Sequence, residues 1–423
     1  MTTLEQEIPL TASIPAAAAV TTATAEGSGV IGGDRKGGAM RITCQQDHLS
    51  RGLAIVSRAV GGRTTLPVLN NVLLASDGDR LKLAATNLEI GITTWVPGRV
   101  EAEGQLTVPA RLLTDFVNSL PGGQTVELDG NTRSHSLHLK SARYTANVKG
   151  IDAEEFPPIP SAEDRPTIKL GAVLLKEMIG QVAFSAARDE SRPVLAGVNL
   201  KVDESKLLMA AADGFRLSVR EAELERGLPE KLDIIVPARA LTELARLLGD
   251  SEEDVEVTVT ANRSQILFRV RTEAGDVNLV SRLLEGQFPD LQRVIPKAHT
   301  TKVTVKRGEL VTATKIASLF ARDSANVVRL EIAPGAEGGL TPGKITLSAN
   351  AAEVGDNHGE LDATVDGEET YISFSSEFLA DVLGVLPSDE IAIEMTGPLS
   401  PAIVRGLGVA DYTHVIMPMH TVR

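Results

Sequence analysis

Hydrophobic positions along this chain follow two periods, and the first is that of an amphipathic helix. In residues 47–60 (DHLSRGLAIVSRAV) the apolar side chains recur every three or four positions, at Leu49, Leu53, Val56 and Val60. This spacing places them on one face, so we expect a helix. Residues 110–120 (ARLLTDFVNSL) predict a second helix, which begins just after a Val-Pro pair.

Other segments alternate between apolar and polar residues, which is the period of a strand. RLKLAA (80–85) and SLHLKSARYTANV (136–148) are each expected to form one strand. Turn sequences such as Asp77-Gly78-Asp79 separate the elements. Two helices and many short strands per unit predict an α+β fold, in which helices cover one face of antiparallel sheets.

The chain repeats this arrangement. Pro67-Val68-Leu69 returns 126 residues later as Pro193-Val194-Leu195, and TVPARLLTDFVNSL (107–120) returns as IVPARALTELARLL (235–248). Both units close on a Phe-Pro pair, Phe156-Pro157 and Phe288-Pro289. Several matches in the same order indicate a true internal repeat.

A third, more divergent copy follows. ELVTATKIASLF (309–320) stands where the first helix belongs, and KITLSANAAEVG (344–355) echoes KLAATNLEIG (82–91). Units of about 125 residues are typical of single domains. We therefore expect a flexible extension and three tandem domains, with boundaries at 1–39, 40–163, 164–297 and 298–423.

Composition narrows the class of protein. The chain has 423 residues, 43% of them hydrophobic, and a formal net charge of −14. Such acidity argues against nucleic-acid binding unless the basic residues gather on one surface. The single cysteine, Cys44, excludes an internal disulfide and a multi-cysteine zinc site. No apolar run approaches a membrane span and residues 1–39 lack the basic start of a secretory signal, so we expect a cytoplasmic protein.

The predicted helices and the segments after them carry basic residues at equivalent places in the three units. These are Arg51, Arg58, Arg63 and Arg111, then Lys176, Arg188, Arg192, Arg239 and Arg246, then Arg307, Lys315 and Arg322. Any one of them is most simply a solvated surface residue. Their recurrence supports the alternative that one basic surface of an acidic protein contacts phosphates without reading sequence.

Sequence motifs of catalysis are absent. TPGKITL (341–347) lacks the glycine spacing of a P-loop, and GSGVIGGDRKGG (27–38) has no preceding strand. His135 and His138 have no third ligand nearby in the sequence, so we expect neither a metal nor a cofactor. The sequence therefore predicts a protein that is not an enzyme.

Five segments carry a resemblance to a known family. In chain order they are GGRTTLPVLNNVLL (61–74), RPVLAGV (192–198), AADGFRL (211–217), FPDLQRVIPK (288–297) and VIMPM (415–419). Together they resemble the bacterial DNA polymerase III β subunit, the sliding clamp, over about residues 40–423.

The resemblance implies a head-to-tail homodimer that closes into a ring of six domains, with helices lining the hole and sheets outside. Such a ring encircles double-stranded DNA without sequence preference and acts as a processivity factor in DNA replication. The implied partners are the clamp loader, the replicative polymerase of the DNA polymerase III holoenzyme and other proteins with a clamp-binding motif, and no membrane.

The resemblance also assigns residues to the DNA and to the dimer interface. It implies DNA contacts at Arg63 and Arg192 and, less directly, at Arg58, Arg111, Lys176, Arg188, Arg239 and Lys315. At the interface it implies that Leu319 and Phe320 of one chain meet the strand around Tyr144 of the other. Ordinary core packing is the alternative for Leu319 and Phe320.

A partner-peptide pocket is implied between the second and third domains. Its residues would be Leu195, Gly214, Phe215, Arg216, Leu217, Pro289, Arg293, Val294, Ser375, Phe378, Leu399, Pro401, Val415, Ile416, Met417, Pro418 and Met419. Several positions depart from the commonest family pattern, such as Phe215 for His, Phe378 for Tyr and Pro401 for Ser. Because these changes remove hydrogen-bond donors, we expect partner motifs to depend mainly on hydrophobic anchors.

Two other classes of protein are also compatible with the sequence. One is a repeat-built scaffold, monomeric and without DNA, and the other is an enzyme with an unrecognised carboxylate site. The C-terminal VIMPM also has two interpretations, either the end of a core strand or the wall of a pocket.

Overall fold

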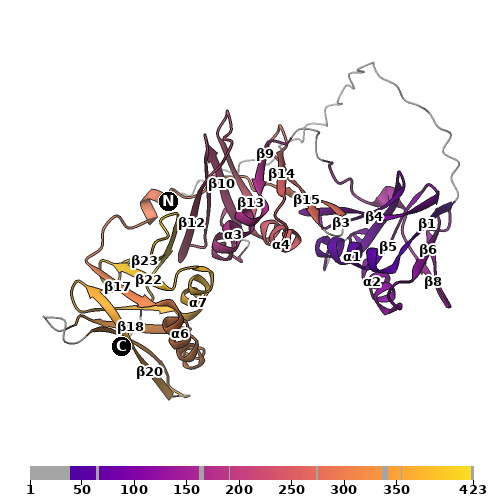
Figure 1. Ribbon diagram of the computed structural model, residues 1–423. Coiled ribbons are helices and arrows are strands. Elements are labelled where there is room, and N and C mark those ends of the chain that lie inside the picture. Colours follow the sequence, from indigo (N-terminus) through magenta and orange to yellow (C-terminus); the bar gives the residue numbers. More distant parts are fainter. Residues whose placement is uncertain are drawn as a thin grey trace, which may run out of the picture. The chain divides into compact units, whose positions relative to one another are not determined.

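The computed structural model describes residues 39–62, 66–161, 166–189, 191–272, 275–335, 342–353 and 355–420. Within these residues one order of elements occurs three times: a strand, a helix, four strands, a second helix and three strands (Figure 1). We call the three copies repeats 1, 2 and 3. The expected α+β fold of three clamp-type units is confirmed.

Repeat 1 consists of β1 (Ala39–Gln45), α1 (Gln46–Val56), β2 (Asn71–Asp77), β3 (Arg80–Thr86), β4 (Ile90–Ala102), β5 (Gln105–Pro109), α2 (Ala110–Ser119), β6 (Thr125–Asn131), β7 (Ser136–Ser141) and β8 (Tyr144–Lys149). Short 3₁₀ turns are η1 (Ser57–Ala59), η2 (Pro67–Asn70) and η3 (Ala153–Glu155).

Repeat 2 consists of β9 (Ile168–Gly171), α3 (Ala172–Val182), β10 (Gly197–Asp203), β11 (Lys206–Ala212), β12 (Arg216–Glu223), β13 (Leu232–Pro237), α4 (Ala238–Leu248), β14 (Asp254–Val259), β15 (Gln265–Thr272) and β16 (Gly275–Arg282). Its 3₁₀ turns are η4 (Ala183–Ser185) and η5 (Pro193–Ala196), and a four-residue helix, α5 (Leu291–Val294), follows it.

Repeat 3 consists of β17 (Thr301–Lys306), α6 (Arg307–Ala321), β18 (Val327–Ala333), β19 (Gly343–Ala351), β20 (Gly355–Asp366), β21 (Thr370–Ser375), α7 (Ser376–Val385), β22 (Glu390–Met395), β23 (Ala402–Gly406) and β24 (Tyr412–Ile416).

Both predicted helices of repeat 1 are confirmed. Helix α1 buries Leu49, Leu53 and Val56, and α2 buries Leu113 and Val117. The Val-Pro signal also has a local cause, because Pro109 directly precedes α2 with φ −55°. The ψ of Pro109 is 114°, which is not helical, so this proline ends β5 and stands directly before the first residue of the helix.

The prediction of a single strand over 136–148 is wrong, because this segment is a hairpin. Ser141 pairs with Tyr144 across a two-residue turn, and Ala142 has φ 49°, in the left-handed region. The buried positions change from odd (Leu137, Leu139) to even (Val148) at this turn. That change of parity was the available signal, since a continuous strand keeps one face inward.

Strands pair across the repeat boundaries, so the repeats share sheets. One twelve-stranded sheet has the main order β8-β7-β6-β1-β4-β16-β15-β14-β9, with β2, β3 and β5 joined beside β4. The other has the order β13-β10-β11-β12-β24-β23-β22-β17-β20-β19-β18-β21. The boundary pairs are β4 with β16 and β12 with β24, and both are antiparallel.

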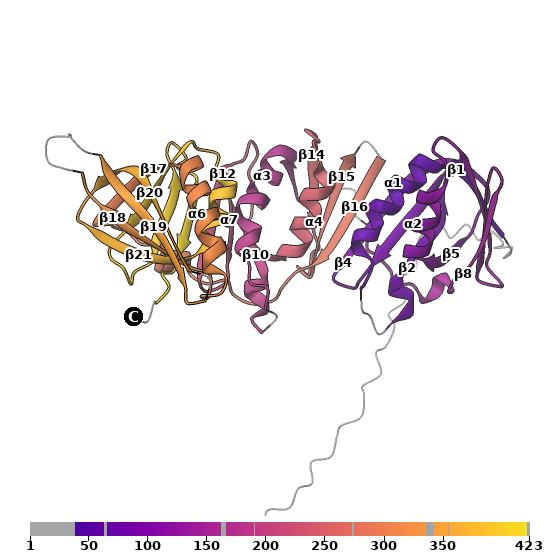
Figure 2. The ribbon, with the colours of Figure 1, turned by 90° about the horizontal axis from the view of Figure 1, so that it is seen from below.

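The helices form pairs over the strands of their own repeats (Figure 2). Helices α1 and α2, α3 and α4, and α6 and α7 contact each other, and α3 also contacts α7 across a boundary. Apolar side chains between helices and strands make one core for repeats 1 and 2 and another for repeat 3. Within the described ranges no helix is long and apolar enough to cross a membrane.

Candidate partner groove and interface edges

A groove of about 350 Å³ lies along the β12–β24 pair, where repeats 2 and 3 meet. Its walls are mainly apolar side chains and prolines, and arginines are its only charged residues. The lining residues are Leu195, Ala212, Gly214, Arg216, Leu217, Phe288, Pro289, Leu291, Arg293, Val294, Pro401, Val415 and Met417. A concave, mainly apolar site with few polar groups is typical of ligand binding.

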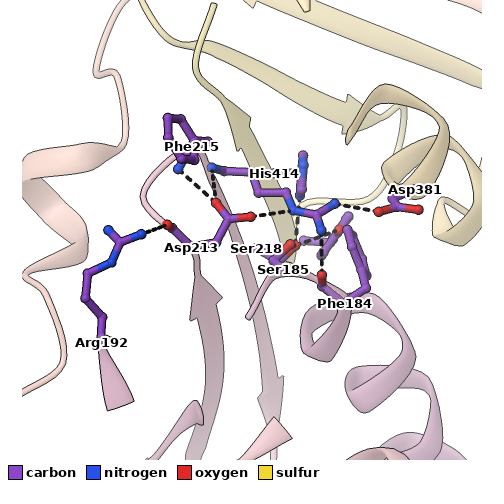
Figure 3. Close-up of polar contacts among 10 residues, drawn as sticks. Phe184, Ser185, Arg192, Asp213, Phe215, Ser218, Asp381 and His414 are labelled. Atoms are coloured by element: carbon purple, nitrogen blue, oxygen red, sulfur yellow. Dashed lines mark hydrogen bonds and ion pairs between the residues drawn. The ribbon is translucent and has the colours of Figure 1, made fainter. Parts of the chain in front are cut away.

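Arg216 joins the two repeats beside this groove, and Figure 3 labels three residues that it contacts, Phe184, Asp213 and Asp381. Its Nε donates to Asp213 Oδ2 (3.0 Å), its Nη1 to Asp381 Oδ2 (2.6 Å) and its Nη2 to the Phe184 carbonyl (2.8 Å). The guanidinium carbon also lies 4.4 Å from the ring centroid of Phe378. The side chain is only 4% exposed, and two carboxylates balance its charge. The buried arginine is therefore fully engaged within the protein.

Asp213 shapes the turn that precedes β12. Its Oδ1 accepts hydrogen bonds from the backbone amides of Phe215 and Arg216, and Gly214 has φ 96°. The turn leaves the Phe215 ring 60% exposed at the rim of the groove. Arg192 donates from Nη2 to the Asp213 carbonyl on the outer side (Figure 3).

A buried polar cluster lies under β24. His414 Nδ1 is 2.8 Å from Ser218 Oγ, and its ring stacks on Phe184 at 5.6 Å between centroids. The Tyr412 hydroxyl donates to the Gln181 carbonyl. Complete burial, together with the nearby Arg216 charge, lowers the pKa of His414 to about 3, so the ring is neutral at physiological pH.

The segment after β24 connects both repeats through its backbone. The Met417 amide donates to the Phe215 carbonyl of repeat 2, and the Met419 amide donates to the Ser373 carbonyl of β21. The Met417 side chain is 38% exposed and lines the groove. Both interpretations of VIMPM thus apply to different parts of it, since Val415 and Ile416 end a core strand.

Several described strands form the edge of a sheet, and two of these free edges are equivalent to the strands that pair across the repeat boundaries. Strand β8 pairs only with β7, and residues 355–363 of β20 pair only with β19. Beside this β20 edge a groove of about 370 Å³ opens against α6, and Ala313, Ile316 and Leu361 contribute its apolar lining. Unpaired edges with an adjacent apolar groove are typical of strand-mediated association.

The predicted basic residues lie partly on the helices and partly on the segments that follow them, and the helices alone carry no net charge. The six helices α1–α4, α6 and α7 carry seven arginines and lysines and seven aspartates and glutamates, so they are neutral as a group. The whole chain has a net charge of −14. The helices therefore do not concentrate basic residues, and what distinguishes them is that they lack the acidic excess of the rest of the chain.

Three family models cover the structured part of the chain. They are the N-terminal, central and C-terminal domains of the DNA polymerase III beta subunit, and they match residues 40–160, 169–290 and 292–420. The chain belongs to this family.

Individual relatives agree with the family models. The chain is 32% identical to the beta sliding clamp of Staphylococcus aureus and 34% identical to that of Synechococcus elongatus. Each match covers 90% of this chain and 99–100% of the relative. The crystal structure of the DNA polymerase sliding clamp from Bacillus subtilis is 32% identical and superposes with a TM-score of 0.83, over 90% of this chain and all of that one.

The structure brings ten of the seventeen pocket residues that the resemblance implied into the wall of the groove. They are Leu195, Gly214, Arg216, Leu217, Pro289, Arg293, Val294, Pro401, Val415 and Met417. Phe215 and Leu399 are 60% and 67% exposed outside this wall, and Phe378 contacts Arg216 instead. Pro418 and Met419 follow Met417 in the tail and do not line it.

Two of these residues are buried away from the groove. Ile416 is 0% exposed and packs in the core of repeat 3, because side chains alternate along β24 and Val415 already faces the groove. Its assignment to the pocket wall is wrong. Ser375 is 7% exposed at the end of β21 and does not line the groove either.

The basic residues assigned to DNA differ in whether they already form ion pairs within the protein. Arg188, Arg239 and Lys315 are exposed and form no ion pair with any described residue, whereas Arg111 is 3.9 Å from Asp115. Arg58 pairs with Glu243 of α4 at 3.3 Å, and Lys176 contacts the Gly249 carbonyl and Asp250. Arg63 lies outside the described residues.

The residues assigned to the dimer interface lie on β8 and on α6, the helix that contacts β20. Tyr144 begins β8 and is 55% exposed, and Leu319 on α6 is 54% exposed. Phe320 is partly buried against the core of its own repeat.

Sequence reasoning missed Phe288 and Leu291 as groove residues and Leu112 as an exposed apolar residue of α2, 53% exposed. The repeated Phe-Pro pair was a signal for the first of these.

Proposed function

We propose that two copies of this chain close head to tail into a ring around duplex DNA and hold a DNA polymerase on it as a processivity factor. The observation that carries this proposal is the strand pairing between repeats. The fourth strand of repeat 1 pairs with the last strand of repeat 2, and the fourth strand of repeat 2 pairs with the last strand of repeat 3. The two strands without such a partner are the fourth of repeat 3, β20, and the last of repeat 1, β8. A second copy supplies both.

The register of this contact follows from the two boundary pairs. Leu279 lies opposite Ile92, and His414 lies opposite Ser218 at the equivalent position. The strand pairs within each repeat show which residues of the free edges are equivalent to these. Ala146 of β8 is equivalent to Leu279 and His414, and Asn357 of β20 is equivalent to Ile92 and Ser218. We therefore expect Ala146 of one chain opposite Asn357 of the other, and Thr145 opposite His358. Acidic Asp356 and Glu360 on β20 would then face a strand flanked by Arg143 and Lys149.

The same symmetry supports the role of Leu319 at the dimer interface. Its equivalents are Arg58 and Phe184, and each reaches the next repeat, through Glu243 and His414 respectively. Leu319 is thus expected to reach α2 of the second copy, where Leu112 is exposed. Phe320 is equivalent to the buried residues Ala59 and Ser185. It supports α6 by packing against the core of repeat 3.

We infer that the helices face the DNA and that Arg188, Arg192, Arg239 and Lys315, with Arg63, make the main phosphate contacts. The helices are neutral whereas the rest of the chain is acidic, so a duplex is repelled less strongly there. Few unpaired cations give weak contacts without sequence preference, which suits a protein that must slide.

The groove between repeats 2 and 3 is proposed as the docking site for short segments of the clamp loader, the polymerase and other partners. Its apolar walls support binding through hydrophobic anchors. Arg216 is already neutralised by Asp213 and Asp381, so an acidic anchor would gain little from it. Arg293 is 86% exposed, and although it lies 3.3 Å from Asp290 it is the charged lining residue best placed to orient a bound peptide.

The test of the groove is a titration with a fluorescein-labelled octapeptide that carries adjacent leucine and phenylalanine anchors. Binding should be lost when either anchor is replaced by alanine, and replacement of its polar residues should have little effect. Equal affinity of the truncated and intact peptides would contradict this role.

The test of the ring is light scattering and retention on DNA. The proposal predicts twice the chain mass of 44.8 kDa and retention, after loading by a clamp loader, on nicked circular DNA during gel filtration. A monomer without retention would favour a scaffold without DNA. As part of the same proposal, the protein carries out no chemical reaction and works in the cytoplasm.

A further inference from the structure

The boundary between repeats 1 and 2 contains a reduced copy of the partner groove. A cavity of about 80 Å³ lies there, along the β4–β16 pair. Gly91 lies opposite Val280 in this pair, as Leu217 lies opposite Val415 in the other. Equivalent residues line both cavities: Thr86 and Ala212, Leu88 and Gly214, Ile90 and Arg216, Gln265 and Pro401, Arg282 and Met417.

The turns beside the two cavities have the same hydrogen bonds. Asn87 Oδ1 accepts from the amides of Glu89 and Ile90, as Asp213 Oδ1 accepts from those of Phe215 and Arg216. Leu88 and Gly214 both have positive φ, 75° and 96°. The strands and turns are therefore alike, and another element must account for the difference in volume.

That element is the linker that follows each Phe-Pro pair. In repeat 1 the residues Pro157–Pro160 themselves line the small cavity. The Ile159 side chain covers Gly91, where an added Cβ would come within 3.0 Å of Ile159 Cγ2. Ile159 also packs on the cluster of Val68, Leu69, Ala84 and Phe156. The linker thus fills the position that is open between repeats 2 and 3.

The second linker takes a different course because of its sequence. After Phe156 the chain reads PPIP, and after Phe288 it reads PDLQ. Asp290 Oδ1 accepts the Gln292 amide at 3.1 Å and so begins α5, which draws Leu291 into the side wall of the groove. Pro160 disfavours helical backbone at Ile159, and residues 157–161 form neither a helix nor a strand.

We propose that this linker determines which boundary of the chain binds a partner peptide. The capped helix α5 keeps the groove between repeats 2 and 3 open, and the PPIP linker closes its counterpart with Ile159 as an internal ligand. The inference rests on the proposed function of the groove and adds the residues that control it.

The test exchanges the linkers. The variant Asp290→Pro/Leu291→Ile/Gln292→Pro gives the second boundary the PPIP sequence, and Gln292→Ala alone, at an exposed linker residue that does not line the groove, is the matched control with the cap retained. With the labelled octapeptide, affinity should fall more than tenfold in the triple variant and stay within twofold in the control. Light scattering should give the dimer mass for both, because the linker lies away from β8 and β20.

Binding by a dimeric triple variant within twofold of the wild type would overturn the proposal. If the triple variant is not dimeric, Asp290→Ala is compared with Asp290→Asn, since both remove the ion pair to Arg293 and only Asp290→Ala also removes the cap. Asp290→Ala should weaken binding of the octapeptide two- to fivefold relative to Asp290→Asn, and an unchanged affinity would overturn the proposal. Failure of the wild-type protein to bind the octapeptide would instead contradict the function proposed for the groove.

Discussion

Arg216 of repeat 2 and Asp381 of repeat 3 form an ion pair across the repeat boundary, with 2.6 Å between Nη1 and Oδ2. The arginine is 4% exposed and the aspartate 39%. The pair connects the groove to helix α7, so the shape of the groove depends on how the two repeats are held together.

Loss of this carboxylate should destabilise the protein. Asp381→Ala leaves a buried guanidinium with one carboxylate fewer, and we expect the free energy of unfolding to fall by about 1–2 kcal/mol, because the aspartate is partly solvated. Denaturant unfolding measures this value. The control is Glu377→Ala on the same helix, expected within about 0.5 kcal/mol of the wild type. Equal effects of the two substitutions would contradict a special role for the pair.

The buried histidine should make stability depend on pH. The pKa of His414 is lowered to about 3 in the folded protein from about 6.5 in the unfolded chain, so the unfolded state binds a proton first as the pH falls. The contribution of His414 to the free energy of unfolding is complete above pH 6.5 and is lost progressively between pH 6.5 and pH 3. At pH 5 the free energy of unfolding is lower by about 2 kcal/mol. His414→Asn should remove this part of the pH dependence, whereas parallel stability curves for variant and wild type between pH 7 and 5 would show that His414 does not cause it.

The proposed register predicts a specific disulfide between chains. Thr145→Cys with His358→Cys places two thiols opposite each other on the exposed face of the joined edges, and mild oxidation should give a covalent dimer on a non-reducing gel. Thr145→Cys with Asn357→Cys is the control, because a one-residue shift moves the second thiol to the other face. Stronger cross-linking in the control would mean that the strands pair in another register.

Charge at Leu319 should separate the chains. Leu319→Asp would bury an unpaired carboxylate against α2 of the second copy, and sedimentation at micromolar concentration should show mainly monomer. Leu407→Asp, at a residue that is also exposed (38%) but lies in the turn between β23 and β24, should remain dimeric. A dimeric Leu319→Asp protein would remove this residue from the interface.

Charge reversal on the helix face should weaken retention on DNA without changing the dimer. Arg239→Glu should lower affinity for a duplex about three- to tenfold and reduce its salt dependence, since a phosphate contact is lost. Arg263→Glu, in the turn between β14 and β15, is the control for net charge. If both variants weaken binding equally, the effect comes from total charge and not from the helix face.

The helices and the repeat could be predicted from the sequence because periodicity and Val-Pro signals are local. The hairpin at Ala142 was missed since only a change of parity marks it, and α5 was missed because four residues carry no period. Ile416 was misassigned because the resemblance assigns the whole run Val415–Met419 to the pocket. Adjacent side chains on a strand point to opposite faces, so Val415 lines the groove and Ile416 packs in the core. The neutrality of the helices depends on their exact bounds, which the sequence alone leaves open. The domain boundaries at 163–164 and 297–298 stay a prediction.

Cutting the DNA decides whether a closed dimer surrounds it. The protein is loaded onto nicked circular DNA, the circle is linearised at a single restriction site, and the fraction still bound is measured by gel filtration. A ring should remain on the circle and be lost from the linear molecule by sliding off its ends. Equal retention on both forms would contradict the account, because a protein held by surface contacts alone has no reason to leave when the circle is opened.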